Sequence, residues 1–127
     1  MSKKVLLIDD EAGFTNLLKM NLERSGDYIV KIENDSTRAL STARSFQPDA
    51  ILLDVVMPEM DGGDVQAQFE KDPNLSKVPV VMLTALVDSA EISEGAVAQS
   101  GQNMVMPKPV DLPLLMRVLE DVTSQGG

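Results

Sequence analysis

The sequence predicts an α/β fold in which a doubly wound parallel sheet of five strands is built from five consecutive strand–helix units. Short apolar runs alternate along the chain with segments whose apolar residues recur at helical spacing. The connections between them are short, as in sheets built by successive crossovers. Three of the runs are almost continuously apolar, which is typical of parallel strands covered by helices on both faces. The predicted strands are residues 5–8, 28–32, 50–53, 78–83 and 104–106.

The segments between and after these strands predict five helices. The first and the last have apolar side chains three or four positions apart. Asp35 or Ser36 can cap the second helix, and Pro48 follows its end. Gly101 can end the fourth helix in the C′ position. The predicted helices cover about residues 14–22, 35–45, 62–71, 88–100 and 112–122.

Length, composition and charge limit the class of protein. With 127 residues, of which 43% are hydrophobic, the chain is expected to form one domain over residues 1–127, with a frayed tail at 124–127. A net charge of −9 disfavours binding to nucleic acid and to anionic membranes. No segment approaches the roughly 20 apolar residues that span a bilayer. We therefore expect a cytoplasmic protein.

The chain contains no cysteine and no histidine. Disulfides, thiolate nucleophiles, imidazole bases and histidine metal ligands are therefore excluded. Any chemistry must use carboxylates, hydroxyl groups, lysine and backbone groups.

Side chains suited to chemistry follow four of the five predicted strands. In chain order they are Asp9 with Asp10, Asp54, Thr84 and Lys108. Doubly wound sheets bind ligands outside the carboxyl ends of their strands, where these residues are expected to meet. Each of them taken alone is also typical of a turn or of a helix cap.

The three carboxylates predict a cation site. Two carboxylates about 4 Å apart repel by roughly 4 kcal/mol at an effective dielectric constant of about 20, so the cluster needs a cation to relieve it. A partly hydrated site made only of oxygen ligands suits Mg²⁺. That ion would repel Lys108 unless an anion bound between them, and Thr84 adds a neutral donor. These are the groups needed to transfer a phosphoryl group onto a carboxylate.

Four sequence blocks resemble the response-regulator receiver domains of two-component signalling. The blocks are VLLIDDE at residues 5–11, ILLDVVMPEMDGG at 51–63, VPVVMLTA at 78–85 and MPKPVD at 106–111. The run from Asp54 to Gly62 is highly specific, and the resemblance covers essentially the whole chain. It implies the flavodoxin-like receiver architecture, with strand order 2-1-3-4-5.

The resemblance also implies roles for the residues at the strand ends. Asp54 would be the phosphoacceptor and would receive its phosphoryl group from a sensor histidine kinase or a histidine phosphotransfer domain. Asp9, Asp10 and Asp54 would hold Mg²⁺ together with the backbone carbonyl of Val56. Lys108 would contact the phosphoryl group.

A conformational switch is a further implication of the resemblance. Thr84 would move toward the phosphoryl group, but the aromatic residue that usually assists it is replaced by Val105, so the route of the signal stays open. Val56 and Leu86, two positions beyond Asp54 and Thr84, are apolar and cannot orient a water molecule. The chain would not act on other substrates as an enzyme. It would catalyse only its own phosphorylation and a slow autodephosphorylation.

The expected output partner is a downstream protein or an effector domain outside this chain. No direct nucleic-acid or membrane partner is expected. A homodimer is an open expectation, through the face formed by the fourth helix, the fifth strand and the last helix. The fifth strand is expected at the edge of the sheet, where Pro107 is tolerated.

Three other interpretations stay open. A phosphatase of the haloacid-dehalogenase type also uses an aspartyl nucleophile, but it requires a second Asp two residues later, where this chain has Glu11 after Asp9 and Val56 after Asp54. A flavodoxin-like flavin carrier requires a loop rich in Ser, Thr and Gly after the first strand, where this chain has acids. A receiver-like scaffold that is never phosphorylated usually lacks one of the key residues.

Overall fold

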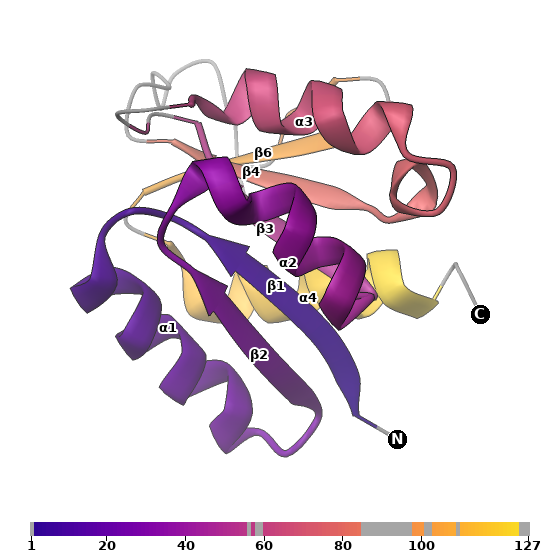
Figure 1. Ribbon diagram of the computed structural model, residues 1–127. Helices are drawn as coiled ribbons and strands as arrows, with labels where there is room; N and C mark the ends of the chain where they lie inside the picture. The colour runs from indigo at the N-terminus through magenta and orange to yellow at the C-terminus, as the bar shows by residue number, and fades with distance from the viewer. Residues whose placement is uncertain are drawn as a thin grey trace.

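The computed structural model describes residues 2–55, 57, 60–84, 98–100, 103–108 and 110–124. Strands and helices alternate along the chain as far as β4, as Figure 1 shows. The elements are β1 (Lys3–Ile8), α1 (Ala12–Arg24), β2 (Tyr28–Glu33), the 3₁₀ turn η1 (Ser36–Arg38), α2 (Ala39–Phe46), β3 (Ala50–Asp54), α3 (Gly62–Lys71), the 3₁₀ turn η2 (Leu75–Lys77), β4 (Val80–Thr84), β5 (Ala98–Ser100), β6 (Asn103–Pro107) and α4 (Leu112–Ser124).

The described strands form a single sheet with the order β2-β1-β3-β4-β6-β5. The first five in this order are parallel to one another, and β5 pairs with β6 in the antiparallel sense. Because β6 is the fifth predicted strand, the predicted order 2-1-3-4-5 is confirmed for the parallel part of the sheet.

Residues 98–100 correct the prediction of the fourth helix. They form β5, in which Ala98 lies opposite Val105 and Ser100 opposite Asn103, instead of the last turn of a helix. An outer strand leaves a row of N–H and C=O groups unpaired, and a short antiparallel partner satisfies some of them on β6. Gly101 is as typical of a hairpin connection as of a helix end. The remainder of that predicted helix, 88–97, lies outside the described residues.

The presence of β5 also corrects the expectation that the fifth predicted strand is the edge of the sheet. The register of β5 covers only residues 103–105 of β6, so Pro107 lies beyond it and has no hydrogen bond to donate to that neighbour. On its other side Pro107 is paired in register with Thr84.

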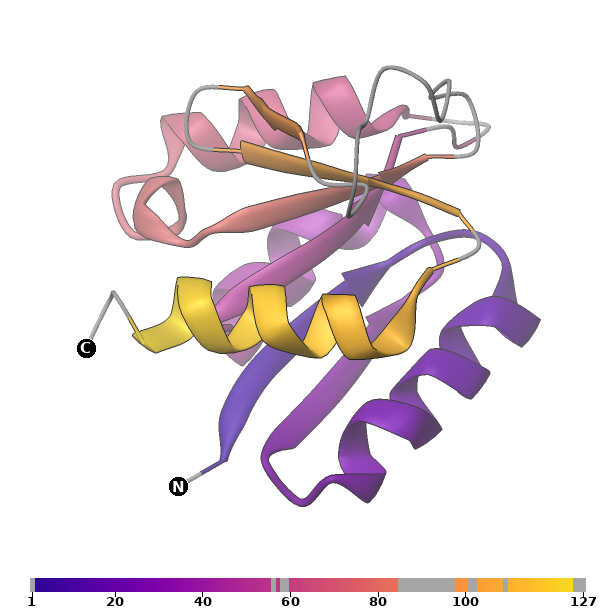
Figure 2. The same ribbon diagram turned by 180° about the vertical axis from the view of Figure 1, so that it is seen from behind.

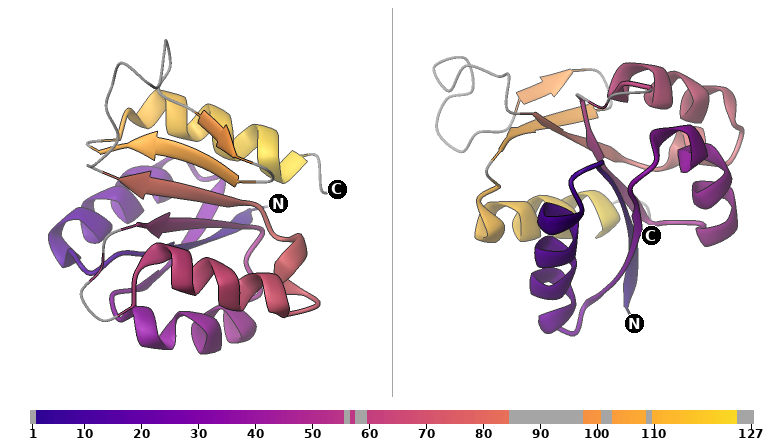
Figure 3. Two further views of the ribbon diagram at one scale, coloured as in Figure 1. Left: turned by 90° about the horizontal axis from the view of Figure 1, so that it is seen from above. Right: turned by 60° about the vertical axis from the view of Figure 1, so that its left-hand side comes forward.

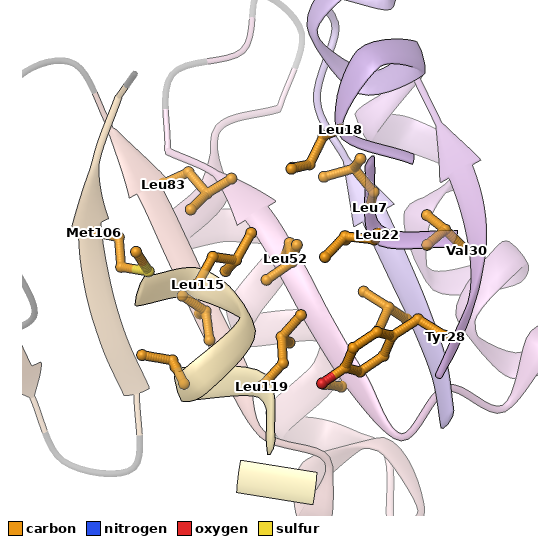
Figure 4. Packing of buried hydrophobic residues seen from close by; sticks show 14 residues of the cluster. Leu7, Leu18, Leu22, Tyr28, Val30, Leu52, Leu83, Met106, Leu115 and Leu119 are labelled. Carbon is orange, nitrogen blue, oxygen red and sulfur yellow. The ribbon is translucent and has the colours of Figure 1, made fainter. Parts of the chain in front are cut away.

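The helices cover the two faces of the sheet in two layers. Figures 1 and 2 show α2 and α3 on one face and α1 and α4 on the other, and the view from above in Figure 3 separates the two layers. Alternate residues of each strand contribute to alternate layers. The α1 and α4 layer, shown in Figure 4, contains Leu7, Leu18, Leu22, Tyr28, Val30, Leu52, Leu83, Met106, Leu115 and Leu119. The α2 and α3 layer contains Leu6, Ile8, Ala39, Ala43, Ile51, Leu53, Val65, Phe69 and Val80.

The second predicted helix begins as a 3₁₀ turn. The Asp35 carboxylate accepts a hydrogen bond of 3.0 Å from the N–H of Thr37 and so caps that turn, as predicted. The helix ends at Phe46, and its C-cap residue Gln47 has a left-handed φ of 54° immediately before Pro48. This sharp end returns the chain to the amino end of β3.

Side chains of α1 satisfy the backbone of the outer strand β2. The N–H of Val30 donates to Glu23 Oε2 at 2.9 Å, and Lys19 Nζ donates to the carbonyl oxygen of Val30, also at 2.9 Å. Lys19 and Glu23 form an ion pair of 2.8 Å one helical turn apart. The helix is therefore attached to the edge of the sheet by polar contacts as well as by its buried face.

The C-terminal helix α4 extends to Ser124, so residue 124 of the predicted frayed tail is helical, and 125–127 lie outside the described residues. Among the helices that the structure describes, none is long and apolar enough to cross a membrane.

Candidate functional site

Parallel pairing brings the carboxyl ends of β1, β3, β4 and β6 to the same edge of the sheet. Ile8 lies opposite Leu53, Asp54 opposite Leu83, and Thr84 opposite Pro107. Asp54 and Thr84 are the last residues of their strands, and Asp9 and Lys108 directly follow theirs. The sheet thus gathers side chains that lie about a hundred positions apart in the sequence.

Three carboxylates form the acidic part of this site. One oxygen from each of Asp9, Asp10 and Asp54 lies within 4.8 Å of the others. Asp9 is fully buried and Asp54 is 4% exposed, whereas Asp10 is exposed. Oδ1 of Asp9 accepts a hydrogen bond of 3.0 Å from the N–H of Glu11, which fixes the turn after β1.

The donor set fits the predicted metal. Two buried carboxylates and an exposed one offer oxygen ligands only, with access for water on the Asp10 side, and this combination suits Mg²⁺. Buried like charges this close need a cation, as expected from the sequence. The fourth predicted ligand, the carbonyl of Val56, lies outside the described residues.

Lys108 brings a positive charge into the acidic cluster. Its Nζ lies 2.6 Å from Asp9 Oδ2, 3.0 Å from Glu11 Oε1 and 3.6 Å from Asp54 Oδ1. Burial lowers the pKa of Lys108, but the contacts with Asp9 and Glu11 and the charges of Asp9 and Asp54 outweigh this, so the pKa is raised above its ordinary value of 10.5. The side chain is 11% exposed and is an ammonium ion at neutral pH.

Thr84 is buried at the end of β4, next to the position of Asp54 on β3. Its backbone carbonyl accepts a hydrogen bond of 3.0 Å from the N–H of Lys108, so the ends of β4 and β6 are joined. Val105, which stands where an aromatic residue was expected, is half-buried on β6 opposite Met82. Leu86 lies outside the described residues.

The structure adds two contacts of Lys108 that the sequence analysis did not assign. Glu11 was considered only as the residue two positions after Asp9, and residue 14 only as the start of the first predicted helix. Glu11 forms an ion pair with Lys108, and the Phe14 ring centroid lies 4.6 Å from Nζ. Both depend on where a long side chain points, which the spacing of residues does not determine.

Gly62 is a further requirement of the site. A Cβ at this position would lie 2.6 Å from the carbonyl oxygen of Asp54 and 2.8 Å from Cα of Val55, both closer than a real Cβ approaches. The N–H of Gly62 donates to the carbonyl of Val55 at 2.8 Å. Asp61 then caps α3 by accepting from the N–H of Asp64. The Asp-Gly pair at 61–62 in the sequence is the signal for this close approach.

Asn34 supports the buried acid from the end of β2. Its Nδ2 donates to the backbone carbonyl of Asp9 at 2.7 Å and to Oγ1 of Thr15 at 3.1 Å. Thr15 is buried in α1. The turn that carries Asp9 is therefore held by a neighbouring strand and a helix.

The site therefore combines a cluster of three carboxylates, which can hold a metal ion, with an ammonium group close to Asp9 and Asp54, and such a site suits an anionic group bound next to Asp54. Comparison with known families agrees with this class. The family model for the response regulator receiver domain matches residues 5–120. The chain belongs to this family of signalling domains.

Relatives and solved structures agree. The chain is 44% identical over 85 residues to the alkaline phosphatase synthesis transcriptional regulatory protein PhoP of Bacillus subtilis. The aligned segment covers 67% of this chain and 34% of that protein. It is 25% identical to the Francisella response regulator 1452 receiver domain, with a TM-score of 0.82 and coverage of 99% and 100% of the two chains. This chain spans about half the length, or less, of the curated relatives that it matches.

A second similar structure contains the expected ion. It is the receiver domain of the sensor histidine kinase PA1611 from Pseudomonas aeruginosa PAO1, with a magnesium ion coordinated in the active site cleft. This chain is 25% identical to it, with a TM-score of 0.78 and coverage of 98% and 99% of the two chains.

Proposed function

We propose that Asp54 accepts a phosphoryl group from a sensor histidine kinase or a histidine phosphotransfer domain, in a reaction that requires Mg²⁺ held by Asp9, Asp10, Asp54 and the carbonyl of Val56. One observation carries the proposal. The buried Asp54 carboxylate shares one cluster with two further carboxylates and with the Lys108 ammonium group, whose Nζ is 3.6 Å from Oδ1.

In this proposal a carboxylate oxygen of Asp54 attacks phosphorus, the new oxygen–phosphorus bond forms, and the bond to the imidazole nitrogen of the donor breaks with its electron pair left on that nitrogen. Lys108 neutralises charge on a phosphoryl oxygen, and the Thr84 hydroxyl donates to another. The bound cation would supply charge neutralisation for the carboxylates and the phosphoryl oxygens. Asn34 and Gly62 keep the strand ends in place, so little rearrangement is needed.

Labelling with acetyl phosphate and Mg²⁺, followed by mass spectrometry, tests this proposal. The wild-type chain should gain the mass of one phosphoryl group, and Asp54→Asn should gain none. Asp64→Asn is the matched control, because it removes a carboxylate from the first turn of α3 that has no contact with Lys108 among the described residues. Labelling of Asp54→Asn at the wild-type rate would contradict the assignment.

The lifetime of the phosphorylated state is a second part of the proposal. The acyl phosphate is lost when water attacks phosphorus in line with the bond to Asp54. Val56 and Leu86 cannot hydrogen-bond that water, so we expect slow autodephosphorylation. Val56→Asn combined with Leu86→Glu should speed phosphate loss at least threefold, equivalent to about 0.7 kcal/mol of barrier. An unchanged decay rate in a folded double variant would refute this expectation.

The proposal also covers how phosphorylation is passed on to a partner. We propose that phosphorylation changes the binding of a downstream protein or of an effector domain, because the curated relatives are transcriptional regulators about twice the length of this chain. A homodimer through the predicted fourth helix, β6 and α4 stays a proposal, and residues 88–97 of that predicted helix lie outside the described residues. The cytoplasmic location, and the absence of a direct nucleic-acid or membrane partner, rest on the family and on the net charge of −9.

A further inference from the structure

The Lys108 ammonium group has two contacts outside the cluster of three aspartates. Glu11 Oε1 lies 3.0 Å from Nζ, and the face of the Phe14 ring lies with its centroid 4.6 Å from the same atom. Glu11 directly precedes α1 and Phe14 lies in its first turn, so the spacing of three places both on one side of the helix. A carboxylate and an aromatic face are both favourable surroundings for an ammonium group.

The backbone around Glu11 is held firmly, but its side chain does not serve the helix. Its N–H donates to Asp9 Oδ1, and its carbonyl accepts from the N–H of Thr15 at 3.0 Å. Glu11 occupies the N-cap position of α1, where the shorter side chains of Asp, Asn, Ser and Thr usually accept from the helix N–H groups, and its own side chain makes no capping hydrogen bond. The carboxylate is directed to Lys108 instead.

The Phe14 ring packs against the Lys108 ammonium group. It is partly buried and also packs against the core layer beneath α1 and α4. The ring attracts the cation without accepting one of its hydrogen bonds strongly. The ring therefore limits where the end of Lys108 lies. Glu11, and not the ring, is then the group that competes with a phosphoryl oxygen for the ammonium group.

The distances show which contacts are in use. An ammonium group has three N–H donors, and the contacts with Asp9 and Glu11 are within hydrogen-bonding distance, whereas the 3.6 Å to Asp54 is beyond it. A phosphoryl oxygen on Asp54 would bind the third donor and would have to share the positive charge and the position of Nζ with Glu11. A cation shared by Asp9, Asp10 and Asp54 would weaken the hold of Asp9 on Lys108. Glu11 lies outside that carboxylate cluster, and its hold would persist.

We propose that Glu11 and Phe14 form a resting position for Lys108, and that Glu11 competes with the incoming phosphoryl oxygen for the ammonium group. Glu11 is then a positioning residue that slows phosphoryl capture and sets the affinity for phosphoryl mimics. This inference rests on the proposed role of Asp54 as phosphoacceptor. It concerns the state of Lys108 before the reaction and goes beyond the assignment of the acceptor.

The rate of labelling tests the competition. At a Mg²⁺ concentration that saturates each variant, Glu11→Gln should be labelled by acetyl phosphate about two- to fivefold faster than wild type, the effect expected from the loss of one partly exposed ion pair. Its affinity for beryllofluoride should rise by a similar factor. Asp64→Asn should leave both quantities at the wild-type value. An equal acceleration in Asp64→Asn, or none in Glu11→Gln, would overturn the proposal.

A shorter acid separates the contact from the charge. Glu11→Asp keeps the negative charge but is one methylene shorter, so it should be labelled as fast as Glu11→Gln. A wild-type rate in Glu11→Asp would mean that the charge alone matters, and the proposal would be wrong. In the Lys108→Ala background, the substitution Glu11→Gln should lose its effect on beryllofluoride binding, because its partner is gone. A persistent effect there would also overturn the proposal.

A spectroscopic measurement on the metal-free protein does not depend on the reaction. The ¹⁵N resonance of the Lys108 ammonium group should shift in both Glu11→Gln and Phe14→Leu, and it should stay unchanged in Asp64→Asn. An unshifted resonance in the first two variants would contradict the resting position. If wild type is not labelled at Asp54 while these shifts occur, the proposed function fails and the resting position stands.

Discussion

Two buried aspartates at opposite ends of the sheet have very different surroundings. Asp72, near the amino end of β4, accepts hydrogen bonds from Arg44 Nε at 2.9 Å and from the N–H groups of Asn74 and Leu75 at 2.9 and 3.0 Å. Asp9, at the carboxyl end of β1, accepts from one N–H group. Its other neighbours are the carboxylates of Asp10 and Asp54 and the Lys108 ammonium group.

The difference shows how the fold divides its acids between stability and function. Two of the three donors around Asp72 are backbone N–H groups, which the folded loop already holds in place, so no further conformational entropy is lost in binding the carboxylate. The partners of Asp9 are like charges and an ammonium group on a long side chain, which can move when a ligand arrives. A carboxylate that serves binding is therefore left less well satisfied than one that serves folding.

The largest expected effect on stability comes from adding a side-chain carbon at Gly62, where two chain segments approach closely at the functional end of the sheet. In Gly62→Ala the added Cβ would meet the carbonyl of Asp54 at 2.6 Å and Cα of Val55 at 2.8 Å, and neither can move without shifting β3. We expect a loss of about 3 kcal/mol in the free energy of unfolding, measured by urea denaturation. Gly63→Ala is the control, with only the Asp61 side chain nearby, and should change stability by less than about 1 kcal/mol. Equal stability of the two variants would contradict the close approach.

A smaller effect, with a definite pH dependence, is expected at the other end. Hydrogen bonds from the N–H of Leu75, from Arg44 and from the N–H of Asn74 lower the pKa of Asp72 below its ordinary value of 3.8, against the effect of burial. A lowered folded-state pKa contributes stability that is present above the unfolded value and is lost as the pH falls through the folded value. Asp72→Asn should therefore be less stable than wild type at pH 7, and the two should converge as the pH falls through the lowered folded-state pKa of Asp72. A difference that stays constant across this range would refute the charge-based contribution.

The smallest expected effect has the opposite sign and sharpens the comparison. Asp54→Asn removes one of three clustered negative charges, so the metal-free variant should be more stable than wild type by about 1 kcal/mol. Adding Mg²⁺ should raise the melting temperature of wild type and reduce the difference. If Asp54→Asn is destabilised in metal-free buffer, then the cluster is not under repulsion, and the contrast with Asp72 fails.

The sequence predicted the parallel strands and their order because continuous apolar runs and short connections leave few alternatives. It also predicted which residues meet, because Asp9, Asp54, Thr84 and Lys108 each stand at a strand end. Their roles in phosphoryl transfer stay proposals. The strand at 98–100 was missed because a three-residue segment has no periodicity to separate a strand from a helix end. The contacts of Glu11 and Phe14 with Lys108 were missed because they depend on side-chain directions in the folded protein.

The attachment of Lys19 and Glu23 to Val30 has a consequence for how the domain behaves among many copies of itself. An outer strand with free backbone groups invites a strand from another molecule, and repeated addition leads to cross-β aggregates. At the middle of β2 both backbone groups of Val30 are already occupied, so an incoming strand would have to displace an ion pair to bind there. A signalling domain that is linked to other domains or held at high local concentration is protected at this position against templated aggregation.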